Sequence, residues 1–343
     1  MLRDIRISCA PHISQALSTR RIMIDVIIGL APVMAAAGYY FRIHALILIS
    51  TCVISCVATE WLCNLIRKKP NSLGDFSAVV TGIILALSLP PRSWPYWQII
   101  MAAIIGSVFS IAIGKMVFGG LGANIFNPAM VGRTFLTASF GALMTTWTVP
   151  ATLDLNMSRI APENYVDTRT QVTPLAWSKL AIKNELGADI YSEKQFKATF
   201  TGEIGGCLGE TSVIAIFIGG LYLLIRRTIN FHIPLAVLAS AFIFAAIAYM
   251  IDSYVYVQPF FHLTSGGLML CAFFIATDPV TAPLTRRGMW IFGTGVGTIT
   301  MLIRIVGEYP EGVMFSILLM NAVTPLIDRL CKSIPAGGKP SIK

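Results

Sequence analysis

The segment FSAVVTGIILALSLP, residues 76–90, is apolar, carries an internal glycine and stops at a double proline. A straight membrane helix needs about 20 residues, so this segment is too short to cross a bilayer comfortably. Residues 262–277, HLTSGGLMLCAFFIAT, form a second short segment with internal glycine, which stops at Asp278-Pro279. Paired segments of this kind predict broken membrane helices that mark a functional centre near the midplane of the bilayer.

The composition agrees with a membrane protein. Of the 343 residues, 55% are apolar and only 13% are charged, and this charged fraction is about half of that usual in soluble proteins. Apolar stretches of roughly 20 residues recur along the chain, which is typical of a polytopic helical membrane protein. We predict spans near residues 22–41, 43–66, 76–90, 96–118, 127–147, 209–226, 232–251, 262–277, 288–306 and 311–330.

These spans predict two membrane halves, residues 1–148 and 209–343, joined by a polar connection over residues 149–208. The two short segments occupy the third place in their respective halves. Five spans per half make the halves enter the membrane from opposite sides, which is the pattern of an inverted repeat. The predicted fold is therefore an all-α polytopic membrane protein, with about ten transmembrane helices as two inverted five-helix repeats with broken helices.

The formal net charge is +9, but the basic residues lie at helix ends and form no patch of the kind that binds nucleic acid. They all fall on one side of the predicted topology. By the positive-inside rule, both chain ends are then cytoplasmic and the 149–208 connection is extracytoplasmic. No cleavable signal peptide is apparent in the first twenty residues. The clusters are Arg20 and Arg21, Arg67 to Lys69, Arg226 and Arg227, Arg286 and Arg287, and Arg329 and Lys332.

Neither the cysteine spacing nor a search for soluble-enzyme motifs indicates a catalytic or metal site. The seven cysteines include no Cys-x-x-Cys pair and no Cys/His spacing suited to zinc or an iron–sulfur cluster, so we predict no metal site. Cys207 stands alone near the predicted outer surface. No hydrolase signature is present, and we assign no catalytic side chain.

The polar connection contains the run DTRTQVTPL, residues 167–175. It resembles the flavin-attachment motif of the NqrB/RnfD family, in which an Asp, then a Ser or Thr, then Ala-Thr marks the threonine that carries FMN through a phosphoester. Asp167, Thr170 and Thr173 fall in register with that motif, while Val172 replaces the usual Ala. The resemblance implies covalent FMN on Thr173. The alternative is a solvated loop whose threonines merely favour turns.

Chemistry limits how such a bond could form. A threonine hydroxyl in water is a poor nucleophile, so a phosphoester at Thr173 requires a dedicated FMN transferase. Pro174 pushes the residue before it towards an extended conformation, which suits access by such an enzyme.

A second motif, GGLGANIFNPA, covers residues 119–129. Its glycines run into a helix start at Pro128, where free backbone N–H groups and the positive end of the helix dipole are presented. Asn127 as the helix N-cap is the simpler interpretation, but capping leaves Asn124 unexplained. The run closely resembles a segment that borders a non-covalent riboflavin in the NqrB/RnfD family, and this implies a riboflavin-binding role for Asn124 and Asn127.

Further candidates are ionisable groups in or beside the spans, where charge is costly unless it is paired, hydrated or bound to a ligand. Asp278 and Thr281 belong to a Thr-Asp-Pro-Val segment that the family also shows. Asp278 could bind a flavin, accept a proton or coordinate a cation, or it could simply terminate a helix. Arg133 could face the FMN phosphate as a bidentate donor. Asp25 and Glu60 lie deepest in apolar segments and are our candidates for ion coupling. The remaining such groups are Asp75, Lys115, Glu210, Arg304 and Glu311.

The resemblance covers nearly the whole chain and is greatest to the RnfD branch. It implies a flavoprotein subunit of a bacterial inner-membrane complex, which carries electrons between ferredoxin and NAD redox partners and couples them to sodium or proton translocation. The implied partners are the other Rnf subunits, the FMN transferase and membrane lipid. Three alternatives stay open: the B subunit of the sodium-translocating NADH:quinone reductase, a small-solute channel or transporter without flavin, or a purely structural assembly subunit.

Overall fold

The computed structural model describes residues 18–70, 72–91, 96–145, 175, 178, 200, 205–210, 212–307, 309 and 311–332. In these ranges all regular secondary structure is helical. The α-helices are α1 (Thr19–Phe41), α2 (Ile43–Ile66), α3 (Ser77–Leu87), α4 (Tyr96–Ile111), α5 (Pro128–Ser139), α6 (Gly141–Met144), α9 (Val213–Ile225), α10 (His232–Ile251), α11 (Pro259–Thr264), α12 (Leu268–Leu270), α13 (Arg286–Ile305) and α14 (Val313–Leu330). The 3-10 turns are η1 (Leu73–Asp75) and η5 (Leu208–Glu210), and the π-helical turns are η2 (Ala112–Met116) and η6 (Cys271–Ile275).

Six of the described helical stretches are long and apolar enough to cross a membrane, and α3 and α9 are shorter apolar helices. The prediction of an all-helical polytopic membrane protein is therefore confirmed. The grouping into two inverted halves stays a prediction.

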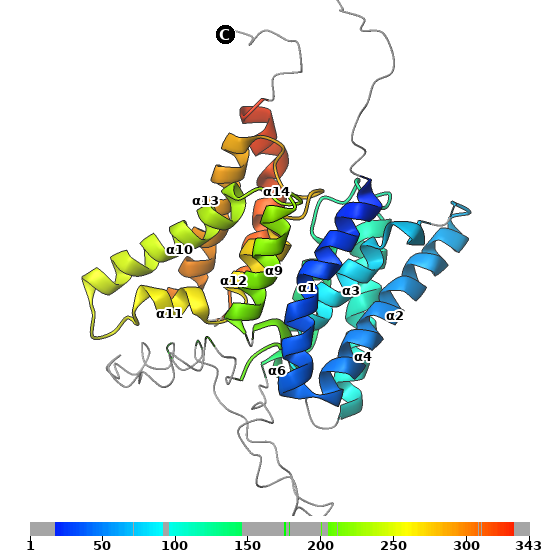
Figure 1. The fold of residues 1–343 in the computed structure, drawn as a ribbon, viewed down its shortest axis with the longest axis horizontal. Coiled ribbons are helices and arrows are strands. Elements are labelled where there is room, and N and C mark those ends of the chain that lie inside the picture. The colour runs from blue at the N-terminus through cyan, green and yellow to red at the C-terminus, as the bar shows by residue number, and fades with distance from the viewer. Residues whose placement is uncertain are drawn as a thin grey trace, which may run out of the picture.

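The helices form two adjoining groups (Figure 1). In one, α2 packs against α3 and α4, and α4 packs against α5; in the other, α13 packs against α10 and α14. The groups meet where α1 packs against α9 and α5 against α14. The α1–α9 crossing is very close, because a Cβ added at Gly219 would overlap the backbone oxygen of Gly29. Small residues at such a crossing let two helix backbones approach each other.

The two short segments have different structures. α3 is a continuous helix that ends at Leu87, before the double proline. The second segment begins at Pro259 as α11, unwinds at Ser265, and resumes as α12 and the π-helical turn η6. The prediction of a broken helix is thus confirmed for the second segment. For the first, the structure shows a short unbroken helix, because its glycine, Gly82, packs against the α2 backbone beside Val53 and interrupts nothing.

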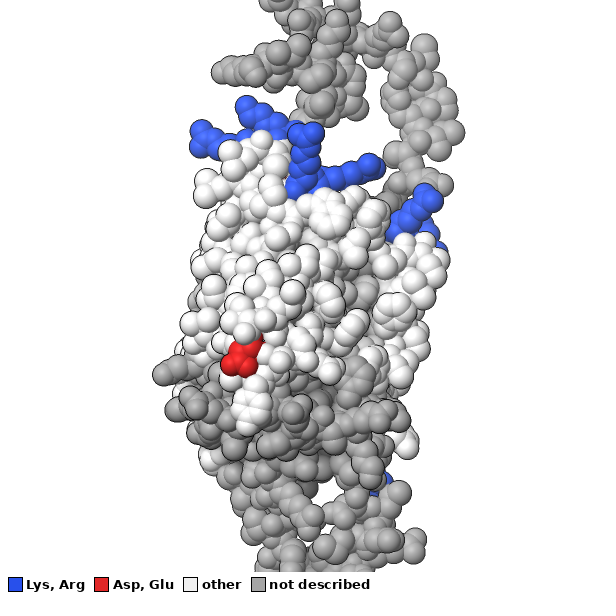
Figure 2. Space-filling view, turned by 90° about the vertical axis from the view of Figure 1, so that its left-hand side faces the viewer, with Lys and Arg blue, Asp and Glu red and all other residues white. Residues whose placement is uncertain are grey.

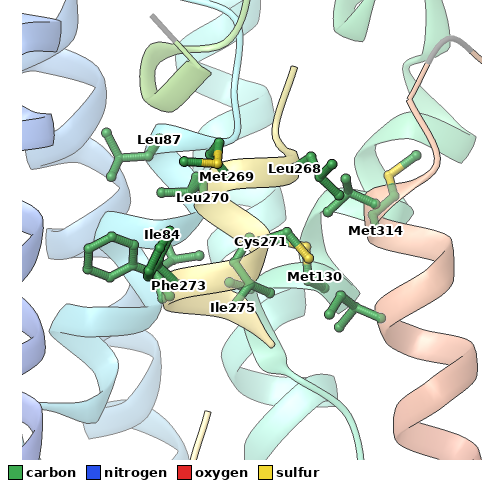
Figure 3. Close-up of a cluster of buried hydrophobic side chains, with 14 of the residues drawn as sticks. Ile84, Leu87, Met130, Leu268, Met269, Leu270, Cys271, Phe273, Ile275 and Met314 are labelled. Carbon is green, nitrogen blue, oxygen red and sulfur yellow. The ribbon is translucent and has the colours of Figure 1, made fainter. Parts of the chain in front are cut away.

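The broken segment lies in the middle of the protein core. In Figure 3 its side chains Leu270, Cys271 and Phe273 lie among residues of three other helices: Ile84 of α3, Met130 of α5 and Met314 of α14. The backbone of an unwound segment can be tolerated at membrane depth when protein buries it in this way.

One predicted span is wrong in its extent. The apolar pattern predicts a single helix over residues 127–147, but α5 ends at Ser139 and the short α6 begins at Gly141. Phe140 between them has the non-helical dihedrals φ −129° and ψ 45°. A single non-helical residue of this kind leaves no trace in the apolar pattern.

Among the described residues, the exposed Lys and Arg side chains other than Arg42 gather at one end of the molecule, in agreement with the predicted orientation. Figure 2 shows Lys and Arg at one end of an otherwise mostly uncharged face. At this end α1 and α13 begin, and α2, α9 and α14 terminate. We call it the basic end; its assignment to the cytoplasm stays a prediction.

Candidate cofactor pocket and buried charge cluster

A pocket of about 680 Å³, counting the part open to solvent, lies near the basic end. Residues from the start of α1, the start of α3 and the end of α9 line it, together with the Gly-rich loop before α5 and the loop after η6. The polar residues of the lining are Ser77, Thr81, Lys115, Asn124, Asn127, Thr228, Thr277 and Asp278.

The two asparagines predicted from the Gly-rich motif both line this pocket. Asn127 caps α5, since its Oδ1 accepts from the N–H groups of Ala129 (3.1 Å) and Met130 (3.3 Å). Its Nδ2 lies 3.5 Å from the backbone oxygen of Ile275 in η6. Capping and pocket lining are therefore both properties of Asn127, and one role does not exclude the other.

Asn124 stabilises the loop that precedes α5. Its Oδ1 accepts from the N–H of Gly122 at 3.3 Å and its Nδ2 donates to the backbone oxygen of Phe126 at 3.2 Å. Gly122 has φ +91°, a conformation that favours glycine. The asparagine thus holds a glycine turn in place at the pocket wall.

Asp278 approaches the pocket from the opposite sequence half and also lines it. Its Oδ1 accepts from the N–H of Val280 at 3.3 Å, and its Oδ2 accepts from the hydroxyl of Thr281 at 3.1 Å. Thr281 is buried, is not a lining residue, and orients Asp278 from behind. Three of the predicted cofactor-binding residues, Asn124, Asn127 and Asp278, therefore meet in one pocket although about 150 positions separate the motifs.

A buried ion pair lies at the pocket wall, and one of its members, Lys115, lines the pocket. Lys115 lies in η2, and its Nζ donates to Glu60 Oε2 of α2 at 2.7 Å and to Ser77 Oγ of α3 at 2.6 Å. Lys115 and Glu60 are 1% and 0% exposed. Glu60 Oε1 also accepts from the hydroxyl of Ser72. The ion-coupling candidate Glu60 is thus a fully paired carboxylate behind the pocket wall.

The other ion-coupling candidate, Asp25, ties α1 to α9. Its Oδ1 accepts from the hydroxyl of Tyr222 at 3.3 Å and from Arg226 at 3.4 Å, and its Oδ2 accepts from Thr228 at 3.2 Å. Asp25 is buried, whereas Arg226 is about two-fifths exposed. Because Thr228 lines the pocket, Asp25 lies directly behind that wall too.

A second cluster of buried charges, which we call the outer cluster, lies away from the pocket. Its members come from the loop before α9, the segment just before α14, and the bodies of α5 and α13. Arg133 does not reach the pocket; it lies 3.5 Å from Glu311 and 3.4 Å from the Cys207 sulfur. The outer cluster consists of Arg133, Cys207, Glu210, Arg304 and Glu311.

Three side chains of the outer cluster have the chemistry of metal ligands. The ligand atoms of Cys207, Glu210 and Glu311 all lie within 4.8 Å of one another. Arg133 and Arg304 balance the two carboxylates, so the group is already close to neutral without a cation. Cys207 is fully buried, and the prediction that it stands alone is wrong, because Arg133 and Glu210 both contact it.

The flavin-attachment motif itself, with Asp167, Thr170 and Thr173, lies outside the described residues. Leu175, two positions after Thr173, is described and packs against Val257 and Phe261. A Cβ added at Gly266 would meet both the Leu175 side chain and Arg304. Leu175 therefore lies beside the unwound part of the broken segment and next to the outer cluster.

Sequence reasoning missed both ion-pair groupings. Lys115 and Glu60 are 55 positions apart, and Arg133 and Cys207 are 74 positions apart. The sequence does indicate which charged residues are buried, and a buried charge needs a partner because its burial is costly. That rule identifies the residues but does not pair them.

The helices define a polytopic membrane protein, and a pocket with several polar lining residues lies among them. The chain belongs to the NQR2, RnfD, RnfE family, whose model matches residues 6–337. This confirms the resemblance on which the functional interpretation of the sequence rests.

Relatives make the comparison more specific. The chain is 43% identical to the D subunit of the Na(+)-translocating ferredoxin:NAD(+) oxidoreductase complex of Acetobacterium woodii, over 96% of this chain and 94% of that protein. It is 41% identical to the D subunit of the proton-translocating ferredoxin:NAD(+) oxidoreductase complex of Clostridium ljungdahlii, over 96% of each. The D subunit of an ion-translocating oxidoreductase complex of Stutzerimonas stutzeri is also 41% identical, over 95% of each. The predicted class, an RnfD-type subunit of an oxidoreductase complex, is confirmed.

Proposed function

We propose that this chain is the membrane flavoprotein subunit of an Rnf complex, which carries electrons between ferredoxin and NAD redox partners and couples them to ion translocation. Its cofactors would be FMN joined covalently to Thr173 and a non-covalent riboflavin in the polar pocket. Bound flavin would supply the electron-accepting and electron-donating chemistry. The remaining Rnf subunits, an FMN transferase and membrane lipid would be its partners.

The observation that carries this proposal is the convergence of Asn124, Asn127 and Asp278 on one pocket. These residues belong to separate sequence motifs, and no local pattern relates the motifs to each other in space. The pocket supplies amides, hydroxyls and an ammonium group beside apolar walls, a mixture that fits a planar ring with polar edges and a ribityl chain. Thr81 and Thr277 add hydroxyls to the same lining.

The position of Leu175 supports a place for the covalent FMN at the other end of the molecule. In the sequence, only Pro174 separates Thr173 from Leu175. A phosphate there would be near Arg304 and the outer cluster. Arg133 belongs to the same cluster, and we therefore propose it as the residue that contacts the phosphate.

Two flavin positions near opposite ends of the helices would give electrons a route along the membrane normal. We propose that the ten predicted spans, as two inverted five-helix halves, provide this arrangement in a bacterial inner membrane, with the basic end cytoplasmic. Asp25 and Glu60, which lie directly behind the pocket wall, are the proposed ion-coupling residues. The two relatives named for sodium and for protons are almost equally similar to this chain, so the proposal covers either ion.

The covalent part of the proposal is tested with the full complex, purified from a host that contains an FMN transferase. We expect the chain to fluoresce as a flavin-containing band on a denaturing gel and to release riboflavin on acid treatment. Thr173→Ala should abolish the fluorescent band, whereas Thr168→Ala, a second threonine of the same segment, should keep it. A wild-type chain without covalent flavin, or a fluorescent Thr173→Ala chain, contradicts the assignment.

The same measurements separate the alternatives. A solute channel or transporter would contain neither flavin and would transport its solute without ferredoxin or NAD. The B subunit of a sodium-translocating NADH:quinone reductase would contain flavin but would work with quinone in place of ferredoxin. The names of the relatives favour the Rnf assignment over both.

A further inference from the structure

Among the described residues, Lys115 is the only Lys or Arg that lines the pocket. Its position depends on a local change of helix geometry. Helix α4 passes into the π-helical turn Ala112–Met116, which contains Lys115. The Met116 backbone oxygen accepts a hydrogen bond from Arg67 Nη1 at 2.7 Å, and Gly114 packs closely against Pro128 at the start of α5. Single π-helical turns inside α-helices are frequently found at functional sites.

The hydrogen bonds of Lys115 leave one donor over. An ammonium group has three N–H donors. Two of them are used by Glu60 Oε2 at 2.7 Å and Ser77 Oγ at 2.6 Å. No third hydrogen bond joins this ammonium group to another described residue, and Lys115 and its partner Ser77 both line the pocket.

The ion pair is also oriented. Lys115 lines the pocket, whereas Glu60 does not and is bonded on its far side by Ser72. Asn64 Nδ2 in turn donates to the Ser72 hydroxyl at 2.9 Å. The ammonium end of the pair is thus bonded to Ser77, which also lines the pocket, and the carboxylate end is bonded to a network outside the lining.

The acidic group of the pocket does not cancel this field by direct contact. Asp278 directs both carboxylate oxygens to hydrogen bonds within its own loop, to Val280 and Thr281. In a site with little water, an oriented charge of this kind acts more strongly than it would in solvent.

We propose that Lys115 is a ligand-binding residue that donates its third N–H to an acceptor atom of the pocket's cofactor and favours the form of that cofactor which carries more negative charge. The cofactor class is a planar heterocycle that gains electrons, and this inference rests on the proposed riboflavin site. Glu60 is a positioning residue, since it fixes the Lys115 ammonium and does not line the pocket, and Ser77, which does line it, holds the same ammonium group from the pocket wall.

The test uses the purified complex and two readouts: riboflavin released by acid per polypeptide, and the midpoint potential of that flavin. The double variant Glu60→Gln/Lys115→Gln removes both charges together and leaves no buried unpaired ion. We expect riboflavin to bind about tenfold or more weakly, as for the loss of one charge-assisted hydrogen bond, and its potential to become more negative. The single variant Glu60→Gln keeps the Lys115 side chain and should retain more riboflavin than the double variant does.

If the double variant does not assemble, a measurement on the wild-type complex tests the role of Lys115. The midpoint potential of the bound, acid-releasable riboflavin should be more positive than that of free riboflavin in the same buffer. A potential equal to or below that of free riboflavin, or a double variant with unchanged occupancy and potential, overturns the role of Lys115 while the pocket assignment stands. A wild-type complex without releasable riboflavin overturns the pocket assignment and this inference together.

Discussion

Arg304 donates hydrogen bonds to two backbone oxygens at the break in the second short segment. Its Nη1 donates to the carbonyl of His262 at 2.6 Å. Its Nη2 donates to the carbonyl of Ser265 at 3.0 Å. Where a helix ends inside a membrane protein, its last carbonyls need donors from elsewhere. A guanidinium group from α13 supplies two of them, and this explains how α11 can end deep in the apolar core.

Replacing this arginine should therefore destabilise the fold. In Arg304→Met, two buried carbonyls lose charged donors, each worth about 1.5–3 kcal/mol. We expect a clearly lower thermal unfolding temperature for the detergent-solubilised complex, followed by tryptophan fluorescence. Arg287→Met, on the same helix but exposed to solvent, is the control and should leave the unfolding temperature unchanged. Equal stability of the two variants would contradict the capping role of Arg304.

The α1–α9 crossing gives a second prediction. In Gly219→Ala, the new methyl group would overlap the Gly29 backbone oxygen, so the two helices must separate at a cost of about 1–3 kcal/mol. The expected result is a lower unfolding temperature and a smaller fraction of assembled complex on size exclusion.

Gly38→Ala is the matched control for this variant. It lies near the end of α1, and a Cβ at this position would meet no atom within 4 Å. Because alanine favours the helix more than glycine does, Gly38→Ala should be neutral or slightly stabilising. If Gly219→Ala behaves in the same way, the close crossing of the two helices is not required for stability.

Much of the fold could be predicted because membrane helices are marked by local composition. The starts of α2 and α10 agree with the predicted spans to the residue, since an apolar run bounded by charge or a turn is a strong signal. The start of α5 was equally clear, because Asn127 and Pro128 have the residue types that helix N-caps and first turns prefer. These features depend on neighbours in sequence.

The features that sequence reasoning did not find depend on neighbours in space. Nothing near Lys115 in the sequence indicates a π-helical turn or a bond to Glu60. Likewise, Cys207 reads as an isolated thiol until the fold brings Arg133 and Glu210 against it. The candidate pocket lies between these two cases: each motif was visible by itself, but their convergence required the three-dimensional structure.

Asp25 provides a test of ion coupling that is separate from the cofactors. Its two oxygens accept from Tyr222, Arg226 and Thr228, so the carboxylate lies among donors that connect α1, α9 and the pocket wall. A buried carboxylate whose charge takes part in translocation cannot be replaced by its neutral amide. In Asp25→Asn we expect fewer ions transported per electron by the complex in proteoliposomes, with flavin content unchanged.

Tyr222→Phe is the control for Asp25→Asn, because it removes one donor to Asp25 and leaves the carboxylate charged. Loss of one hydrogen bond to a charged group costs about 1.5–3 kcal/mol, but the carboxylate keeps its charge and its other donors, so the ratio of ions to electrons should stay near that of the wild type. The exposed Arg226 remains solvated in both variants, and neither leaves a buried cation without a partner. An unchanged ratio in Asp25→Asn would remove Asp25 from the ion route and leave it as a link between α1 and α9, with Glu60 as the remaining candidate.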